Sequence, residues 1–530
     1  MRLTMFLPLL LVACATIADA QPSSRQPTPA ERAARWSAHV AALADDAMEG
    51  REAGTPGHER AARYVAAELR RLGLEPAGTD GYFQPINFTQ LRVDHSASSA
   101  TLTVGASAMP VALPGTAMVN ARRPLPARVD APLVFVGYGL HMPSAGHDDL
   151  AGVDLRGKIA VYVGGGPTDT TGYTRSHALS QRARLLAERG AIGSIVVPTP
   201  RQLSAGWDAV TRNAGEPGPF FADPARDGAG FLELVWNPAE AQRLFAGSGR
   251  NFAEIAADAD ASRRLQSFDM GARLAGRFVT STQPLSTPNV VALLRGSDPA
   301  AAAEHIVMTA HLDGIGIGPP VNGDRIYNGA LDNAAGVAAM LDMAEQLRRL
   351  RPRRSILFVF VTAEEKGLLG SNYFIRRPTV PRESIVANLN YDMALPLFPL
   401  RGVTMLGAEQ STLGDDARAV GAAMGLPLVP DPFPDRNSFI RSDQYSFIQA
   451  GIPAAAFKFG FAAGTPEAEI ERAFRATRYH EPSDDLTATI FREDEIRLHD
   501  FIIALAVRIA DAPERPRWNQ GSIFGPNGAR

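Results

Sequence analysis

The sequence predicts an α/β protein in which helices sandwich a mixed, largely parallel sheet. Four continuous apolar runs in its second half lack the polar alternation of half-exposed strands, so we expect strands buried on both faces. Helical patterns separate or follow these runs, which favours a sheet covered by helices. The apolar runs are 289–294, 305–310, 355–363 and 384–391, and the helical segments are 333–350, 366–376, 412–424 and 493–511.

A second domain is expected within this sheet domain. At 530 residues the chain exceeds the length at which a single core stops growing. In the middle section, runs such as PLVFVGYG and KIAVYVGGG alternate with loops rich in Gly, Pro and Asp, a pattern typical of strands. We therefore expect a mainly-β insertion at 96–284. It divides the sheet domain into 31–95 and 285–515 and leaves a C-terminal tail at 516–530.

Residues 1–20 have the features of a signal peptide. An apolar stretch follows Arg2, and Ala18-Asp19-Ala20 forms a small-x-small cleavage site. Export to a bacterial periplasm or to the exterior is therefore expected, with a flexible, Pro-rich leader at 21–30. The alternative is a lipoprotein anchored through Cys14, the single cysteine of the chain, because LVAC is similar to a lipobox.

Composition argues against two classes of partner. A formal net charge of -3 and a pI near 6.4 give no electrostatic signal for nucleic acid. Beyond the N-terminal residues, no stretch approaches the roughly 20 apolar residues that a membrane-spanning helix needs.

Acidic residues and histidines follow the ends of the buried runs. In parallel sheets ligands collect beyond the carboxyl ends of the strands. Taken singly, each such residue is explained by a solvated loop or a helix cap. Together they predict a metal site, because carboxylates assembled at one edge repel each other unless a cation lies among them. The residues at the ends of the runs are His311, Asp313, Glu364, Glu365 and Asp392; Asp332 begins a helix and His480 lies in the loop RYHEPSDD.

Two zinc ions fit this set of side chains. Zinc accepts imidazole and carboxylate ligands, and two histidines with three carboxylates serve two ions only if one carboxylate bridges them. Such ions lie about 3.5–4 Å apart and can share a hydroxide. Neighbouring residues in extended backbone point in opposite directions, so one of Glu364 and Glu365 can ligate metal while the other acts as general base. Asp313 is expected to hold the His311 imidazole in the required tautomer.

Five motifs in this order resemble the zinc-dependent aminopeptidase family that includes glutamate carboxypeptidase II. They are AHLDG, NGALDNAAG, TAEEKGLLGS, NYDM and YHEPSDD. The early stretch DDAMEGREAGTPGHERAARYVAAELRRLGL is similar to the N-terminal region of that family, and the middle section resembles a protease-associated domain. The resemblance covers most of residues 35–510.

The resemblance implies a role for each site residue. Asp332 would bridge the two zinc ions, and the peptide bond after it would be cis. Glu364 would be the general base. Tyr479 would stabilise the oxyanion, with a packed aromatic residue as the equal alternative. The first zinc would take His311 and Asp392, and the second would take Glu365 and His480.

The sequence also departs from the family pattern. Gln444 stands where a histidine is frequent, and a long Gly- and Pro-rich loop separates His311 from Asp332. No long helical dimerisation domain follows residue 511, so the dimer of the carboxypeptidase branch is not assumed and no oligomeric state is predicted.

The function predicted from these residues is that of an exported aminopeptidase. It would remove N-terminal residues from peptides through a zinc-bridging hydroxide, and its substrates would need a free N-terminus. One alternative is a carboxypeptidase that acts on acidic dipeptides, for which Arg436 and Arg441 are candidate carboxylate-binding residues. A glutaminyl cyclase-like transferase with one zinc and a receptor-like scaffold without activity are further alternatives, and the complete ligand set argues against both.

Overall fold

The computed structural model describes residues 26–525, apart from residues 168–171, 204–205, 212–216 and 222–229. The expected signal peptide, Cys14 and the first half of the expected leader lie outside the described residues. The second half of that leader is not irregular throughout, because helix α1 (Pro29–Leu43) begins within it. Thr28 caps this helix, and Glu31 completes a capping box. None of the described helices has the length and apolar composition needed to cross a membrane.

The sheet that carries the site is mixed and largely parallel, which confirms the predicted fold class. Around the site its strand order is β18-β19-β17-β13-β16-β12, and beyond β12 the same sheet continues into the middle section. Strand β13 pairs in parallel with β16 and β17, and β17 pairs in parallel with β19, whereas β12 and β18 join the sheet antiparallel. The bounds are β12 (Phe268–Leu294), β13 (His305–His311), β16 (Ser355–Val361), β17 (Ile385–Asn390), β18 (Val403–Leu406) and β19 (Ala454–Phe459).

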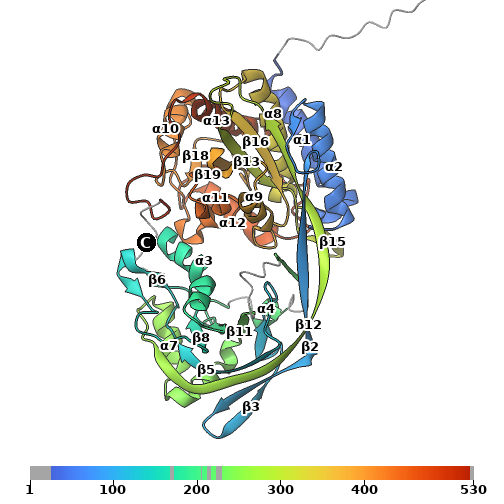
Figure 1. Cartoon of the computed structure of the whole chain (residues 1–530). Coiled ribbons are helices and arrows are strands. Elements are labelled where there is room, and N and C mark those ends of the chain that lie inside the picture. The colour runs from blue at the N-terminus through green and yellow to red at the C-terminus, as the bar shows by residue number, and fades with distance from the viewer. Residues whose placement is uncertain (1–25, 168–171, 204–205, 212–216, 222–229, 526–530) are drawn as a thin grey trace, which may run out of the picture.

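The continuous apolar runs arise because helices cover both faces of this sheet (Figure 1). Every residue of β13, β16 and β17 is buried. Met308 and Phe358 pack into one core with α1 and its neighbouring helices, whereas Val307 and Leu357 pack into a second core on the opposite face. Successive side chains of a strand point to opposite faces, so a strand between two helical layers is apolar at every position.

The first face is covered by α1, α2 (Pro56–Arg71), α8 (Ala335–Leu350), α10 (Leu413–Met424) and α13 (Arg492–Asp511). The second is covered by α9 (Leu369–Arg376) and α11 (Gln444–Gln449), and α12 (Pro466–Thr477) lies near the strand ends. A buried ion pair joins helices of the first face: Arg32 on α1 donates to both carboxylate oxygens of Asp342 on α8, at 3.0 and 2.7 Å. His499 on α13 contacts the same carboxylate at 2.9 Å.

The middle section has a core of its own, but no loop separates it from the sheet domain. Strand β2 (Phe83–Val104) pairs antiparallel with β12 along nearly all of its length, and both strands run from one core into the other (Figure 1). The expected boundaries at 95/96 and 284/285 therefore fall inside strands. Residues 94–99 and 280–286 at these boundaries are exposed or partly exposed, so a polar stretch that was expected to separate two domains is instead extended strand. The assignment to a protease-associated domain stays a prediction.

Strands β5, β8, β9 and β11 of the middle section form parallel pairs, and helices α3 and α7 pack beside them. The remaining bounds are β1 (Glu75–Pro76), β3 (Ser107–Val111), β4 (Ala117–Val119), β5 (Arg128–Phe135), β6 (His141–Met142), β7 (His147–Asp148), β8 (Ile159–Val163), α3 (Gly172–Glu188), β9 (Gly193–Val197), α4 (Trp207–Thr211), β10 (Gly218–Phe220), β11 (Leu232–Trp236), α6 (Gln242–Phe245), α7 (Phe252–Asp260), β14 (Gly316–Val321) and β15 (Asp324–Tyr327).

Candidate active site

All five predicted metal ligands meet at the carboxyl edge of the parallel strands. His311 ends β13, and the loops after β16 and β17 carry Glu365 and Asp392. Asp332 lies in an irregular turn before α8, and His480 lies in the loop after α12. These residues form overlapping groups whose ligand atoms lie within 4.8 Å of one another. Residues far apart in the chain thus converge because parallel strands end at one edge.

Asp332 lies between the two histidines. Its Oδ1 is 3.1 Å from Nε2 of His311, and its Oδ2 is 3.3 Å from Nε2 of His480. Each imidazole faces one further carboxylate. Asp392 Oδ1 is 3.5 Å from Nε2 of His311, and Glu365 Oε2 is 3.2 Å from Nε2 of His480. The five residues therefore form two sets of three that share Asp332, as the predicted bridge requires.

The electrostatics of the set are those of a site for cations. Burial lowers the pKa of His311, but the adjoining carboxylates of Asp332 and Asp392 raise it well above its usual value. Burial likewise opposes protonation of His480, whereas Asp332 and Glu365 raise its pKa to about 10. In both cases the carboxylates draw a positive charge onto the imidazole. A divalent ion in the same place would supply that charge directly.

The residues also fit zinc by their chemistry. Each set offers one imidazole and two carboxylates, which are ligands that zinc accepts, and three protein ligands leave room for a further one. Asp392 Oδ1 is buried and has no hydrogen-bond partner among the described residues. An oxygen in that position costs free energy unless a cation satisfies it. Both sets can therefore hold a divalent ion.

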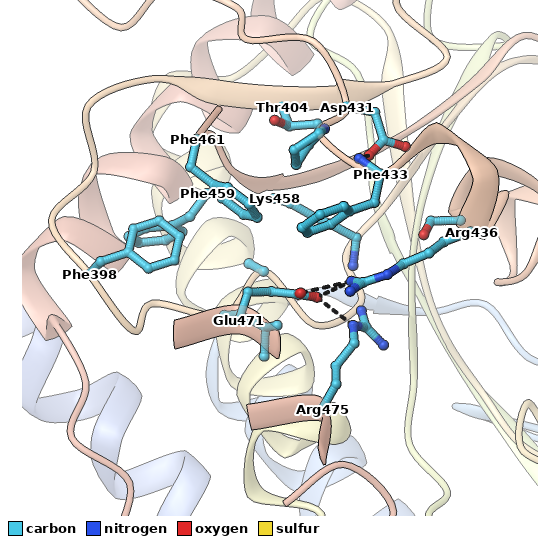
Figure 2. Close-up of a pocket in the computed structure, with 14 residues that line it drawn as sticks. Phe398, Thr404, Asp431, Phe433, Arg436, Lys458, Phe459, Phe461, Glu471 and Arg475 are labelled. Carbon is cyan, nitrogen blue, oxygen red and sulfur yellow. Dashed lines mark hydrogen bonds and ion pairs between the residues drawn. The ribbon is translucent and has the colours of Figure 1, made fainter. Parts of the chain in front are cut away.

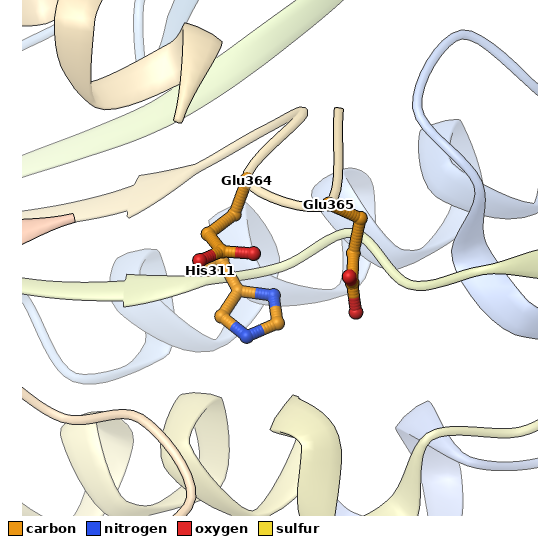
Figure 3. Close-up of side chains that lie close together, drawn as sticks. All are labelled: His311, Glu364 and Glu365. Atoms are coloured by element: carbon orange, nitrogen blue, oxygen red, sulfur yellow. The ribbon is translucent and has the colours of Figure 1, made fainter. Parts of the chain in front are cut away.

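Glu364 lies beside the ligands and belongs to neither set that contains Asp332. Figure 3 shows its side chain leaving the same loop as Glu365, with His311 close by. Burial raises the pKa of Glu364 well above its usual value; the charge of His311 opposes this shift, and the nearby Glu365 and Asp392 carboxylates add to it. A buried carboxyl group with a raised pKa is suited to accept and return a proton.

Asp313 contacts both His311 and the glutamate loop. Its main-chain oxygen lies 3.1 Å from Nδ1 of His311, and an acceptor there favours the tautomer whose free Nε2 faces the site. The Asp313 carboxylate is not the closer partner, since its Oδ1 is 3.9 Å from Nδ1. It instead accepts the main-chain N–H groups of Glu364 and Glu365, at 3.0 and 3.3 Å. Asp313 thus also fixes the loop that carries both glutamates.

Two residues that sequence reasoning missed hold the turn that presents Asp332. The Arg51 guanidinium is fully buried and donates to the main-chain oxygens of Leu312, Asn328 and Gly329 at 3.1, 2.6 and 2.9 Å. It also donates to the main-chain oxygen of Leu43 at 2.6 Å.

Asp484 is the second residue. Its carboxylate accepts the main-chain N–H groups of Leu331 and Asp332, at 3.0 and 2.9 Å. The Asp332–Asn333 peptide is cis, as the family resemblance implied. Both Arg51 and Asp484 lie in stretches quoted for that resemblance. No periodicity marks them, because each acts on main-chain atoms.

Tyr479 both packs and lines the site. Its ring stacks on His480, with ring centroids 3.8 Å apart. The guanidinium carbon of Arg475, a residue of α12, lies 5.1 Å from the centroid of the Tyr479 ring. Burial raises the pKa of the Tyr479 hydroxyl, and the carboxylates of Asp332 and Glu365 raise it further. The hydroxyl therefore stays protonated and can donate a hydrogen bond.

Gln444, which departs from the family pattern, forms hydrogen bonds that hold neighbouring elements together. Its side chain is fully buried, accepts from Asn390 Nδ2 at 2.7 Å and donates to the main-chain oxygen of Phe439 at 2.9 Å. These bonds join α11 to the end of β17, which precedes Asp392. Arg436, one candidate carboxylate-binding residue, is engaged by Glu471 at 2.6 Å, whereas Arg441 is exposed at the hollow beside the ligands.

Comparison with known proteins agrees with this fold. The sheet, its helical layers and the shared-carboxylate ligand set are those expected of a metallopeptidase. Residues 289–506 match the model of Peptidase family M28, which confirms the predicted resemblance for this part of the chain.

Relatives extend the similarity beyond that stretch. Probable leucine aminopeptidase 2 of Aspergillus fumigatus is 25% identical over 452 residues, which cover 82% of this chain and 74% of the relative. Aminopeptidase Y of Saccharomyces cerevisiae is 28% identical over 211 residues, 38% of this chain and 35% of that protein. The structure of an aminopeptidase from Aneurinibacillus sp. strain AM-1 has a TM-score of 0.53 at 20% identity and covers 91% of this chain and 95% of its own.

The substitution Arg51→Met tests the support of the Asp332 turn. Methionine fills similar space but leaves four buried carbonyl oxygens without their donor, so we expect the free energy of unfolding to fall by about 3 kcal/mol. Urea unfolding measures this loss. The exposed Arg63→Met on α2 is the control and should stay within about 0.5 kcal/mol of the wild type. Equal stability of the two variants would contradict the role given to Arg51.

Proposed function

We propose that this protein is an exported, zinc-dependent aminopeptidase with two zinc ions per chain. The arrangement of two histidines around one shared carboxylate carries the proposal, because it matches the donor set of a paired zinc site. The match of residues 289–506 to Peptidase family M28 supports peptide hydrolysis. The relatives named aminopeptidases support action at the N-terminus. Export rests on the signal-like residues 1–20, with attachment through Cys14 as its alternative.

Five residues would hold the metal. His311 and Asp392 would bind one ion, Glu365 and His480 the other, and Asp332 both. When bound, zinc supplies a Lewis acid that polarises the scissile carbonyl and makes water more acidic.

Glu364 would move the proton. Its buried carboxylate would accept a proton from the attacking water and return it to the amine that leaves, a task for which a raised pKa is suited. Asp313 keeps this carboxylate in place through the main-chain N–H of Glu364. The Tyr479 hydroxyl would donate a hydrogen bond to the oxygen that gains negative charge as water adds.

The alternatives receive less support. Arg436 is neutralised by Glu471, which weakens the case for a terminal-carboxylate site built from Arg436 and Arg441. A single-zinc transferase and an inactive scaffold do not require two complete ligand sets, yet both sets are present. Metal analysis of the pure protein, with hydrolysis of aminoacyl-anilides and N-blocked acidic dipeptides, separates these functions. Cleavage of blocked dipeptides alone would refute the aminopeptidase.

The variant Glu364→Gln should fold and bind two zinc ions, but its kcat should fall by about 10²- to 10⁴-fold because the amide cannot accept the proton. Steady-state hydrolysis of leucyl-4-nitroanilide and zinc content by atomic emission measure the two effects. Glu383→Gln, at an exposed residue before β17, is the control and should keep full activity. A rate for Glu364→Gln near that of the control would refute the base assignment.

The variant Asp332→Ala should lose tightly bound zinc, because it removes one ligand from each set at once. Zinc is counted after exhaustive dialysis. The exposed Asp324→Ala in β15 should retain two ions and shows the effect of removing a nearby carboxylate that is not a ligand. Two ions still bound to Asp332→Ala would show that this residue is not the bridge.

A further inference from the structure

Two adjoining hollows lie beside the ligand set. The first has an empty volume of about 540 Å³ and contains the proposed ligands other than His311, with Met393 and Leu406 on its wall. The second has an empty volume of about 430 Å³ and is walled by Phe398, Phe433 and Phe461 (Figure 2). They share Ser438, Lys458 and Arg475. A substrate held at the proposed zinc ions would therefore place its nearest side chain against these shared residues.

Lys458 is the charged residue of an otherwise apolar strand. Strand β19 reads AAAFKF, and its five other residues are buried. The Lys458 side chain is partly buried, and its Nζ donates to the main-chain oxygen of Met393 at 3.2 Å, one residue beyond Asp392. Lys458 forms no ion pair with any residue that the structure describes. A cation in this setting has lost water without gaining a carboxylate, which costs free energy until an anion arrives.

Neighbouring charges do not satisfy Lys458. Glu471 is the nearby carboxylate, and it already binds Arg436 at 2.6 and 2.7 Å and accepts from Arg475 Nε. Figure 2 shows both guanidinium groups against this one carboxylate, with the Lys458 amine close by. The other carboxylate of the hollow, Asp431, accepts the main-chain N–H of Phe433 and pairs with none of these cations.

The metal ligands do not satisfy it either once the proposed ions are bound. The attraction between Lys458 and the carboxylates of Asp332 and Asp392 would be cancelled by the charge of two divalent cations. Arg441 adds another positive charge at the hollow and has no described ion-pair partner. The space next to the reacting bond therefore has more positive than negative charge. Its walls are apolar, so the attraction between opposite charges is stronger there than in water.

We infer that this pocket selects an acidic N-terminal residue, aspartate or glutamate, whose side-chain carboxylate pairs with Lys458. The inference rests on the proposed aminopeptidase function and names its substrate class. Met393 and Leu406 would contact the methylene groups of the side chain, and Arg475 would add a second positive charge. Lys458 is thus a specificity-determining residue.

Hydrolysis of glutamyl-, glutaminyl- and leucyl-4-nitroanilide by the zinc-loaded full chain tests this. Glutamine matches glutamate in size and lacks only the charge. We expect kcat/KM for the glutamyl substrate to exceed that for the glutaminyl substrate by about 10- to 100-fold, as for a hydrogen bond to a charged group. In Lys458→Met this ratio should fall to about one or below, whereas Lys458→Arg should keep most of it.

Lys158→Met is the matched control, because it makes the same change of side chain and net charge in the middle section, one residue before β8. It should keep the wild-type ratio. Suppose that leucyl-4-nitroanilide is cleaved. A ratio of kcat/KM for the glutamyl substrate to that for the glutaminyl substrate near one in the wild type, or an unchanged ratio in Lys458→Met, would then overturn the inference alone. Failure to cleave any of the three anilides would instead refute the proposed function, and the inference with it.

Discussion

Carboxylates that repel one another lie at one edge of the sheet, and the surrounding structure has to hold them together against this repulsion. Asp332, Glu364, Glu365 and Asp392 lie near one another with little access to water, and the charges that offset them are those of the two imidazoles, Arg51 and Lys458. Such a group is unfavourable unless cations join it. The surrounding bonds hold the carboxylates together regardless. Asp313 and Asp484 each accept two main-chain N–H groups of the ligand loops, and Arg51 fastens those loops to the N-terminal segment.

Much of this architecture could be predicted from local patterns. Strands β13, β16 and β17 are apolar throughout because helices cover both faces, and their parallel ends bring His311, Glu365 and Asp392 together. Strands β18 and β19 were not expected, since four and six residues with a lysine give little periodicity. Helices α8 and α9 begin two and three residues later than expected, because the turns before them present Asp332 and the glutamates. Arg51 and Asp484 were missed because they act on main-chain atoms, which leave no pattern in the sequence.

The pocket shows how one fold can serve different substrates. The fold and the ligand set would place a peptide bond at the proposed metal ions, whereas the side chains of β19 and α12 would decide what lies beside it. Lys458 and Arg475 reach this space from elements that also pack into the core, so their positions are set by the rigid scaffold. Selectivity is thereby separated from the chemistry, and either can change while the other is kept.

Strands β2 and β12 give the molecule a mechanical property. Main-chain hydrogen bonds join the two strands where they pass between the two cores. The connection is therefore a two-stranded antiparallel sheet and not two independent flexible linkers. Swivelling of the middle section would break a ladder of hydrogen bonds. The bulge between Arg277 and Val279 interrupts the ladder, but Phe278 at that point is buried in the core of the middle section. Any motion of the middle section relative to the sheet domain would therefore have to bend both strands together.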